Sequence, residues 1–213
     1  MSGREHVLGS VRRQLGRTAG SPVPPPPPVA LLGNPLDQAS RRKAFCERLR
    51  AVGGTVHEAA DAAAAAAVVR TVLAAHGARS LACSRAPMVR AVAECLRALD
   101  PGLAVHDDAD RDTLATVDAG CTGATLAVAE TGTLVLAEDL ERARLPSLLP
   151  PLHIALLDPA NILSHLGEAL ARLPSPLPRA VTFVTGPSRT ADIELELVVG
   201  VHGPKDLHVV LVG

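Results

Sequence analysis

Short apolar segments alternate with longer segments of helical character along most of the chain. The apolar segments predict strands at residues 55–58, 79–83, 103–106, 124–129, 132–137, 152–157, 180–185 and 207–212. The longer segments predict helices at residues 37–52, 61–76, 86–99 and 159–173, with a helical turn over 110–118. Strands that are apolar throughout are buried on both faces, as in a parallel sheet covered by helices. The pattern therefore predicts an α/β fold of three layers with a mostly parallel sheet.

One strand pair departs from the alternation. Only Glu130 and Thr131 separate the apolar segments 124–129 and 132–137. A connection this short joins antiparallel strands, because a parallel crossover needs a dozen or more residues. We therefore expect a β-hairpin at this point of the chain.

The first 36 residues have a different pattern. Val7, Val11 and Leu15 form one apolar stripe on a short basic helix, and a proline-rich run at residues 21–29 follows it. The stripe fits packing on the chain's own domain or on a second subunit; docking to a partner or to a membrane surface is the alternative. The expected organisation is an amphipathic helix in residues 1–20, a stiff linker in 21–36 and an α/β domain in 37–213.

Composition narrows the possible functions. The 213 residues include two Phe and no Trp or Tyr, and the formal net charge is −1. Binding of single-stranded nucleic acid usually relies on aromatic stacking, and duplex binding on a basic surplus, so no nucleic-acid partner is expected. The mean hydropathy of +0.24 indicates a folded chain with an aliphatic core.

Cysteine spacing and hydropathy set further limits. Cys46, Cys83, Cys95 and Cys121 are widely spaced and form no CxxC pair, which argues against a zinc or iron–sulfur site. The sequence also has no flavin or nicotinamide fingerprint, so we expect no metal site and no cofactor in this chain. No signal peptide and no apolar run of membrane-spanning length is present, which predicts a cytoplasmic protein without a membrane span.

The first motif with potential chemistry lies in the predicted hairpin. Glu130, Thr131, Gly132 and Thr133 follow one apolar strand and begin the next. The threonine hydroxyls and free N–H groups could hold an oxyanion, and Gly132 permits a tight turn or a close approach. The simpler interpretation is a hairpin turn with a solvated glutamate.

A second motif directly follows the predicted strand 180–185. Gly186 and Pro187 end that strand, and Ser188 or Thr190 fits the N-cap of a following helix. A helix N-terminus binds anions, and Arg189 adds a forked donor for carboxylate or phosphate. The acidic side chains of this motif, Asp192 and Glu194, supply acceptors. A capped helix with a local ion pair is the structural alternative.

Histidines provide a third candidate. His202 stands between two glycines, the second being Gly203, just before the last strand. It is a candidate general base or hydrogen-bond donor, and a histidine in a turn is the alternative. The histidines within predicted strands, His57, His153 and His208, are interpreted as core or face positions.

Together these segments resemble one known family. The sequences AETGTLVL (129–136), TGPSRTADIE (185–194) and GVHGPKDLHVVLV (200–212) are similar to those of the lactate-utilization protein C family, also called the LUD domain family. The resemblance implies a fold of the NagB/RpiA/CoA-transferase group. It marks as site positions Glu130 and His202, considered catalytic, and the ligand-binding residues Thr131, Gly132, Thr133, Gly186, Ser188, Arg189, Thr190, Asp192, Glu194 and Gly203. We expect Arg189 to share a pocket with Glu130 or His202.

The resemblance also implies a function. It points to a three-part system that oxidises L-lactate to pyruvate, whose partner subunits carry the iron–sulfur clusters. This chain is then a non-redox subunit that binds a small organic anion, such as lactate or pyruvate, or organises the complex, and it can form an oligomer. Two alternatives remain open: a freestanding CoA-transferase-like or sugar-phosphate enzyme that uses Glu130, and a non-catalytic assembly module.

Overall fold

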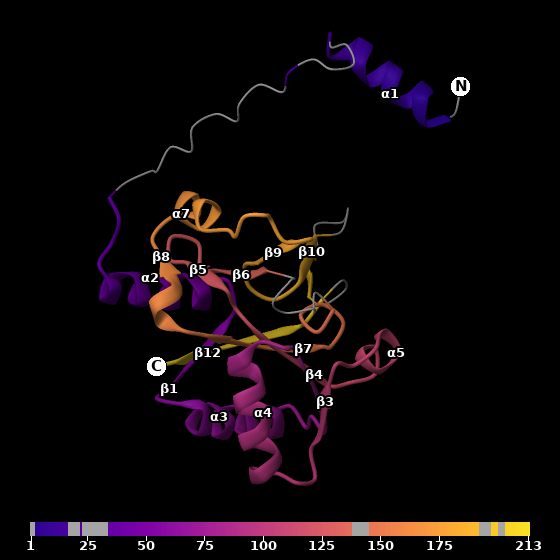
Figure 1. The fold of residues 1–213 in the computed structure, drawn as a ribbon. Coiled ribbons are helices and arrows are strands. Elements are labelled where there is room, and N and C mark those ends of the chain that lie inside the picture. The colour runs from indigo at the N-terminus through magenta and orange to yellow at the C-terminus, as the bar shows by residue number, and fades with distance from the viewer. Residues whose placement is uncertain (1–2, 17–21, 23–33, 138–144, 192–196, 200–202) are drawn as a thin grey trace. The chain divides into compact units, whose positions relative to one another are not determined.

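The computed structural model describes residues 3–16, 22, 34–137, 145–191, 197–199 and 203–213 (Figure 1). Contacts divide the chain into two compact units, residues 1–30 and residues 31–213. The first unit contains helix α1 (Gly3–Gln14), on which Val7 and Val11 are exposed. The second unit contains all the other described elements.

A six-stranded parallel sheet forms the centre of the second unit. Its strands follow the order β1-β12-β7-β4-β2-β3, and every neighbouring pair is parallel. The strands are β1 (Thr55–Ala59), β2 (Ser80–Cys83), β3 (Ala104–Asp107), β4 (Ala119–Gly123), β7 (Leu152–Leu157) and β12 (Asp206–Val212). The two innermost strands, β7 and β4, are buried at every position. The predicted α/β class and mostly parallel sheet are confirmed.

Helices α3 (Ala62–Ala75) and α4 (Pro87–Leu99) cover one face of this sheet (Figure 1). Both bury residues at helical spacing, such as Val89, Val92 and Leu96 of α4, in one aliphatic core cluster with β2, β4 and β7. Asp61 caps α3 by accepting a hydrogen bond from the Ala64 N–H at 2.8 Å. These helices match the predicted ones within one or two residues at each end. The short helix α5 (Arg111–Leu114) lies within the turn predicted over 110–118.

The other face carries helix α2 (Gln38–Ala51) and a second, four-stranded sheet of order β8-β5-β6-β9. Its strands are β5 (Leu126–Val128), β6 (Thr133–Ala137), β8 (Ile162–Leu163) and β9 (Val181–Val184). The predicted hairpin is confirmed, because β5 and β6 pair antiparallel. Buried side chains of α2, including Phe45 and Leu49, pack with both sheets in a second core cluster. Helix α2 is therefore held between the two sheets.

The predicted helix over 159–173 is wrong. This segment forms a 3-10 turn η1 (Pro159–Asn161), strand β8 and a short helix α7 (Leu166–Ala171). Ile162 and Leu163 pair with β5 and are fully buried in the second sheet. Strand pairing with a distant segment thus overrides the local helical pattern.

Besides β8, three strands were not predicted. Strand β4 has the sequence AGCTG, which lacks large apolar residues, yet it lies between β7 and β2. Its Gly120 fits because a Cβ there would be 1.9 Å from the carbonyl oxygen of Pro146. Strand β11 (Leu197–Val199) pairs antiparallel with β10 (Arg189–Ala191) in a separate two-stranded sheet.

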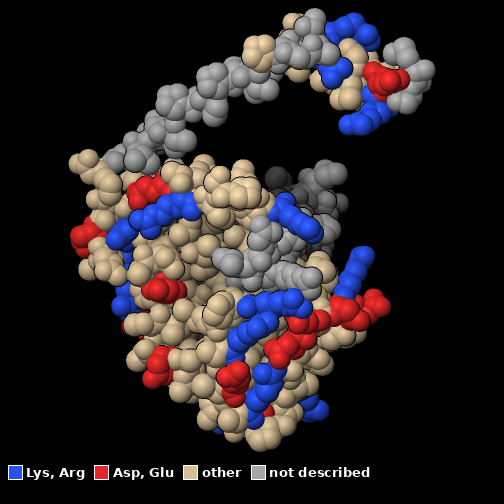
Figure 2. All heavy atoms as spheres, in the orientation of Figure 1, with Lys and Arg blue, Asp and Glu red and all other residues tan. Residues whose placement is uncertain are grey.

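Charged side chains of both signs are interspersed over the face shown in Figure 2. Arg85 pairs with Asp108, and Arg97 with Asp107, at the side of the molecule where β3 forms the sheet edge. Among the described residues, no helix combines the length and apolar character needed to cross a membrane.

Candidate functional site

Glu130 lies in the turn between β5 and β6 and binds the start of helix α7. Its Oε1 accepts a hydrogen bond from the Leu166 N–H at 2.7 Å, and its Oε2 lies 2.9 Å from the His165 Nδ1. The hydrogen bond with His165, followed by that from Leu166, lowers the pKa of Glu130, and the same contact raises the pKa of His165. Both carboxylate oxygens are therefore engaged, and the carboxylate is ionised at neutral pH. His165 was not among the predicted site residues.

Three threonine hydroxyls form a row beside this turn. The Oγ1 of Thr133 lies 2.7 Å from that of Thr131 and 2.7 Å from that of Thr185. Strand pairing brings Thr133 and Thr185 together. Leu134 of β6 is opposite Val184 of the antiparallel strand β9, so the residue before Leu134 lies next to the residue after Val184. Thr133 is buried, whereas Thr131 and Thr185 are exposed. Thr185 joins the predicted residues only through the tertiary structure.

The glycines of both motifs contact the C-terminal half of α2. Gly132 has a φ of +68°, and a Cβ there would lie 2.5 Å from the backbone N of Leu49. Gly186 has a φ of +88°, and a Cβ there would lie 2.8 Å from the Val52 carbonyl oxygen. Both positions thus need glycine for backbone conformation and for a close approach to the helix.

Arg189 lies at the C-terminus of α2. Its Nη2 donates a hydrogen bond of 2.8 Å to the carbonyl oxygen of Val52, the C-cap residue of that helix. A cation is favourable there, because the last carbonyl groups of a helix carry partial negative charge. The side chains of Arg189 and Glu130 therefore have different partners in this structure.

The helix predicted to begin at Ser188 or Thr190 is wrong, because strand β10 begins at Arg189. The Ser188 N–H donates to the Pro204 carbonyl oxygen at 2.9 Å, and a Cβ on Gly203 would lie 3.1 Å from the Ser188 Cβ. Ser188 and Gly203 are thus neighbours. The backbone of Thr190 lies in β10, whereas the predicted site residues Asp192, Glu194 and His202 lie outside the described residues.

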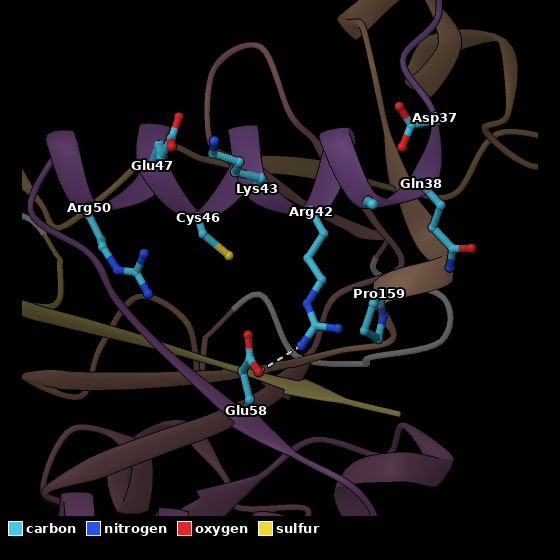
Figure 3. Close-up of a pocket in the computed structure, with 10 residues that line it drawn as sticks. Asp37, Gln38, Arg42, Lys43, Cys46, Glu47, Arg50, Glu58 and Pro159 are labelled. Carbon is cyan, nitrogen blue, oxygen red and sulfur yellow. Dashed lines mark ion pairs between the residues drawn. The ribbon is translucent and has the colours of Figure 1, made fainter.

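A groove of about 680 Å³ runs along a different face of α2. Figure 3 shows the side chains of Arg42, Cys46 and Arg50 extending from α2 toward Glu58 of β1. The three helix residues are spaced i, i+4 and i+8, which places them on one face. Asp37 is the N-cap residue of α2, and its carboxylate accepts a hydrogen bond from the Ser40 N–H at 3.0 Å.

Charge in the groove is partly compensated. Arg42 Nη2 lies 2.8 Å from Glu58 Oε2, and both side chains are partly exposed. The guanidinium group of Arg50 has no hydrogen bond or ion pair with another residue that the structure describes. Burial raises the pKa of the Cys46 thiol, so that side chain is neutral. The groove residues were not predicted from the sequence, in which residues 37–52 were expected only to form a helix.

A smaller crevice of about 240 Å³ lies where β2, β4 and β7 end. It is lined by Thr125, Asp158 and Asn161 together with the first residues of α4. From β2 the chain continues to β3 through α4, on one face of the sheet. From β4 it continues into the second sheet, on the other face, so the direction of winding changes between β2 and β4. Ligands in open α/β sheets often bind at such a change. Among the described residues, the carboxylate of Asp158 is the only charged group that lines this crevice.

In the described parts of the chain, no three His, Cys, Asp or Glu side chains are arranged to hold a metal ion. None of the described cysteines forms a disulfide, and Cys46, Cys83 and Cys121 are buried.

Comparison with known proteins places these features in a family. An uncharacterized protein from Neisseria meningitidis serogroup B is 42% identical over 96 residues, which is 43% of this chain and 40% of that protein. Lactate utilization protein C 1 from Bacillus mycoides is 43% identical over 93 residues, or 41% of this chain and 40% of that protein. The chain thus matches about two-fifths of the length of these relatives.

A solved structure and a family match cover more of the chain. The crystal structure of a DUF162 family protein from Deinococcus radiodurans has a TM-score of 0.61 and 24% identity, and the match covers 84% of this chain and 99% of that one. This likeness is one of fold, and it fits the predicted NagB/RpiA/CoA-transferase-like class. The LUD domain matches residues 42–212, which include the groove, the hairpin and both later motifs. The chain belongs to the LUD domain family.

Proposed function

We propose that this chain serves lactate utilization as a component of a three-part iron–sulfur system that oxidises L-lactate to pyruvate. Relatives named lactate utilization protein C, such as those of Bacillus mycoides and Bacillus licheniformis, are 43% and 40% identical to it over the matched residues. In this proposal the iron–sulfur clusters reside in the partner subunits, and this chain binds a small organic anion.

The observation that best supports anion binding is the threonine row beside Arg189. Thr131 and Thr185 are exposed residues, and the hydroxyl oxygen of each lies 2.7 Å from that of Thr133. Gly186 and Arg189 both contact Val52, so the end of the row and the guanidinium lie at the same end of α2. Arg189 is exposed and uses one Nη2 donor on Val52. Its remaining donors suit the carboxylate of lactate or pyruvate.

A direct role of Glu130 as nucleophile has less support. Its two oxygens already accept hydrogen bonds from Leu166 and His165. Attack on a thioester would require at least one of these oxygens to give up its partner, and hydrogen bonds to a carboxylate lower its nucleophilicity. We therefore assign Glu130 the task of holding α7 and the hairpin together, and rank the CoA-transferase-like alternative below the lactate system.

Growth on L-lactate tests this proposal. A strain lacking this chain is complemented with the wild type or with Arg189→Gln, Thr131→Val or, as a surface control, Arg172→Gln. We expect deletion to abolish growth, Arg189→Gln and Thr131→Val to impair it, and Arg172→Gln to restore it. Normal growth of the deletion strain on L-lactate would refute the role in lactate utilization.

Co-purification separates the remaining possibilities. The wild-type chain is expected to retain iron–sulfur partner proteins. If Arg189→Gln and Thr131→Val support normal growth while the partners are retained, the chain is an assembly module and the anion site is wrong.

A further inference from the structure

The groove along α2 is lined by residues other than those of the sequence motifs. It is lined by side chains of α2, by Glu58 and by Pro159, and it contains none of the residues that form the threonine row. We propose that this groove binds a second kind of ligand, a phosphate monoester that also carries hydroxyl groups, such as a sugar phosphate.

The groove is the right size for such a ligand. Its volume of about 680 Å³ lies within the range of about 300–1,000 Å³ that is typical of small-molecule sites. A three-carbon acid such as lactate would fill only a small part of it. The groove therefore has room for a ligand larger than the substrate of the proposed lactate system.

Two guanidinium groups provide the anion contacts. Arg42 and Arg50 lie eight residues apart on α2, about 12 Å along the helix axis at 1.5 Å per residue. Both side chains extend into the groove on the side that faces Glu58 (Figure 3). A phosphate group carries close to two negative charges at neutral pH and three acceptor oxygens, so it can accept from more than one forked donor.

The existing ion pair leaves these donors accessible. Arg50 has no partner for its guanidinium among the described side chains. The side chains of Arg42 and Glu58 are 38% and 64% exposed, and a pair this open contributes little to stability. A bound phosphate can therefore engage Arg50 directly and share Arg42 with Glu58.

Carboxylates around the groove suit the remainder of such a ligand. Glu58 has one oxygen on Arg42, and its other oxygen can accept from a hydroxyl group. Asp37, the N-cap residue of α2, also lines the groove, but its carboxylate already accepts a hydrogen bond from the Ser40 N–H. No Phe is among the described residues that line the groove, so a nucleobase could stack there only on the arginine guanidinium planes. A sugar phosphate therefore fits the lining better than a nucleotide.

The groove also lies where ligands of α/β proteins bind. Glu58 is the penultimate residue of β1, and Pro159 follows the end of β7. Both positions are at the carboxyl edge of the parallel sheet, outside which open α/β folds place their ligands.

Isothermal titration calorimetry on the full chain tests the inference. The probes are glucose 6-phosphate, glucose, inorganic phosphate, AMP and L-lactate. We expect glucose 6-phosphate to bind more tightly than glucose, phosphate or AMP. Loss of one charge-assisted contact predicts a weakening of about tenfold or more in Arg50→Gln.

The control is Arg70→Gln on α3, an exposed arginine outside the groove, which should bind glucose 6-phosphate like the wild type. Unchanged affinity in Arg50→Gln, or no binding of glucose 6-phosphate at millimolar concentration, would overturn the proposal. Tighter binding of AMP would overturn the sugar-phosphate assignment. Competition between L-lactate and glucose 6-phosphate, with both lost in Arg50→Gln, would show one shared site instead of two. None of these outcomes changes the growth test of the lactate proposal.

Discussion

At the scale of single residues, the motif side chains contact partners that the neighbouring sequence does not predict. Glu130 binds His165 and Leu166, more than 30 residues away, and Arg189 binds the carbonyl oxygen of Val52. His153 was expected at a core or face position, and it is buried in β7 with its Nε2 2.8 Å from the Thr122 Oγ1. Residue type thus indicated which positions could take part in a site, whereas the tertiary structure determines which groups each of them contacts.

The burial of His153 predicts a pH dependence of stability. Burial lowers the pKa of His153 to about 4, from the value of 6.5 expected in the unfolded chain. Between pH 6.5 and 4 the unfolded state binds more protons than the folded state, so the free energy of unfolding falls as the pH falls. At about 1.4 kcal/mol per pKa unit, His153 alone accounts for a loss of about 3 kcal/mol across this window.

Urea denaturation at a series of pH values measures this effect. His153→Gln removes the titrating group, and we expect stability to fall less steeply with decreasing pH than in the wild type. The control is His6→Gln, because His6 is exposed on α1. Equal slopes for the wild type and His153→Gln would contradict the prediction.

At the scale of elements, local signals succeeded where an element forms by itself. Asp37 and Asp61 cap α2 and α3 as N-caps do in general. The same reasoning failed at Ile162 and Leu163, which pair with β5, and at β4, whose small residues accept a close neighbour. These elements exist because of contacts with distant segments, and periodicity within a short window does not encode such contacts.

The contact between the β5–β6 turn and α2 gives a prediction at this scale. Gly132→Ala would place a Cβ 2.5 Å from the Leu49 backbone N, at a φ of +68°. Gly77 has a φ of +63° but nothing within 4 Å of its Cβ position, so Gly77→Ala measures the backbone cost alone. We expect Gly132→Ala to lower the free energy of unfolding by about 2 kcal/mol more than Gly77→Ala. Equal losses in urea titrations would show that the close approach to α2 is unimportant.

At the scale of the whole molecule, the contacts of the chain fall into two units. Residues 31–213 contain the central sheet, the groove and the threonine row, and the family match begins within this unit at residue 42. The organisation expected from the sequence, with a helix in 1–20, a linker in 21–36 and a domain in 37–213, stays a prediction.

Truncation tests that organisation. A chain that begins at Leu31 is expected to unfold cooperatively with a Tm within about 2 °C of the full chain, because it keeps all contacts of the second unit. A chain that begins at Gln38 loses the Asp37 cap and the 2.8 Å hydrogen bond from the Leu36 N–H to the Ser164 Oγ. We expect the second truncation to cost a further 1–2 kcal/mol or so. Circular dichroism melts of both chains check this, and a large loss on removing residues 1–30 would contradict it.

The sequence by itself determined the α/β class, the helices α2, α3 and α4 and the antiparallel hairpin around Glu130. Those features depend on periodicity, caps and turn residues, which act over a few positions of the chain. Only the tertiary structure decided that Glu130 binds His165, that Thr185 completes a row with Thr131 and Thr133, and that Arg42 and Arg50 face Glu58 in one groove. Such contacts depend on strand order and on how α2 lies between two sheets, and both are set by pairing and packing between segments far apart in the chain.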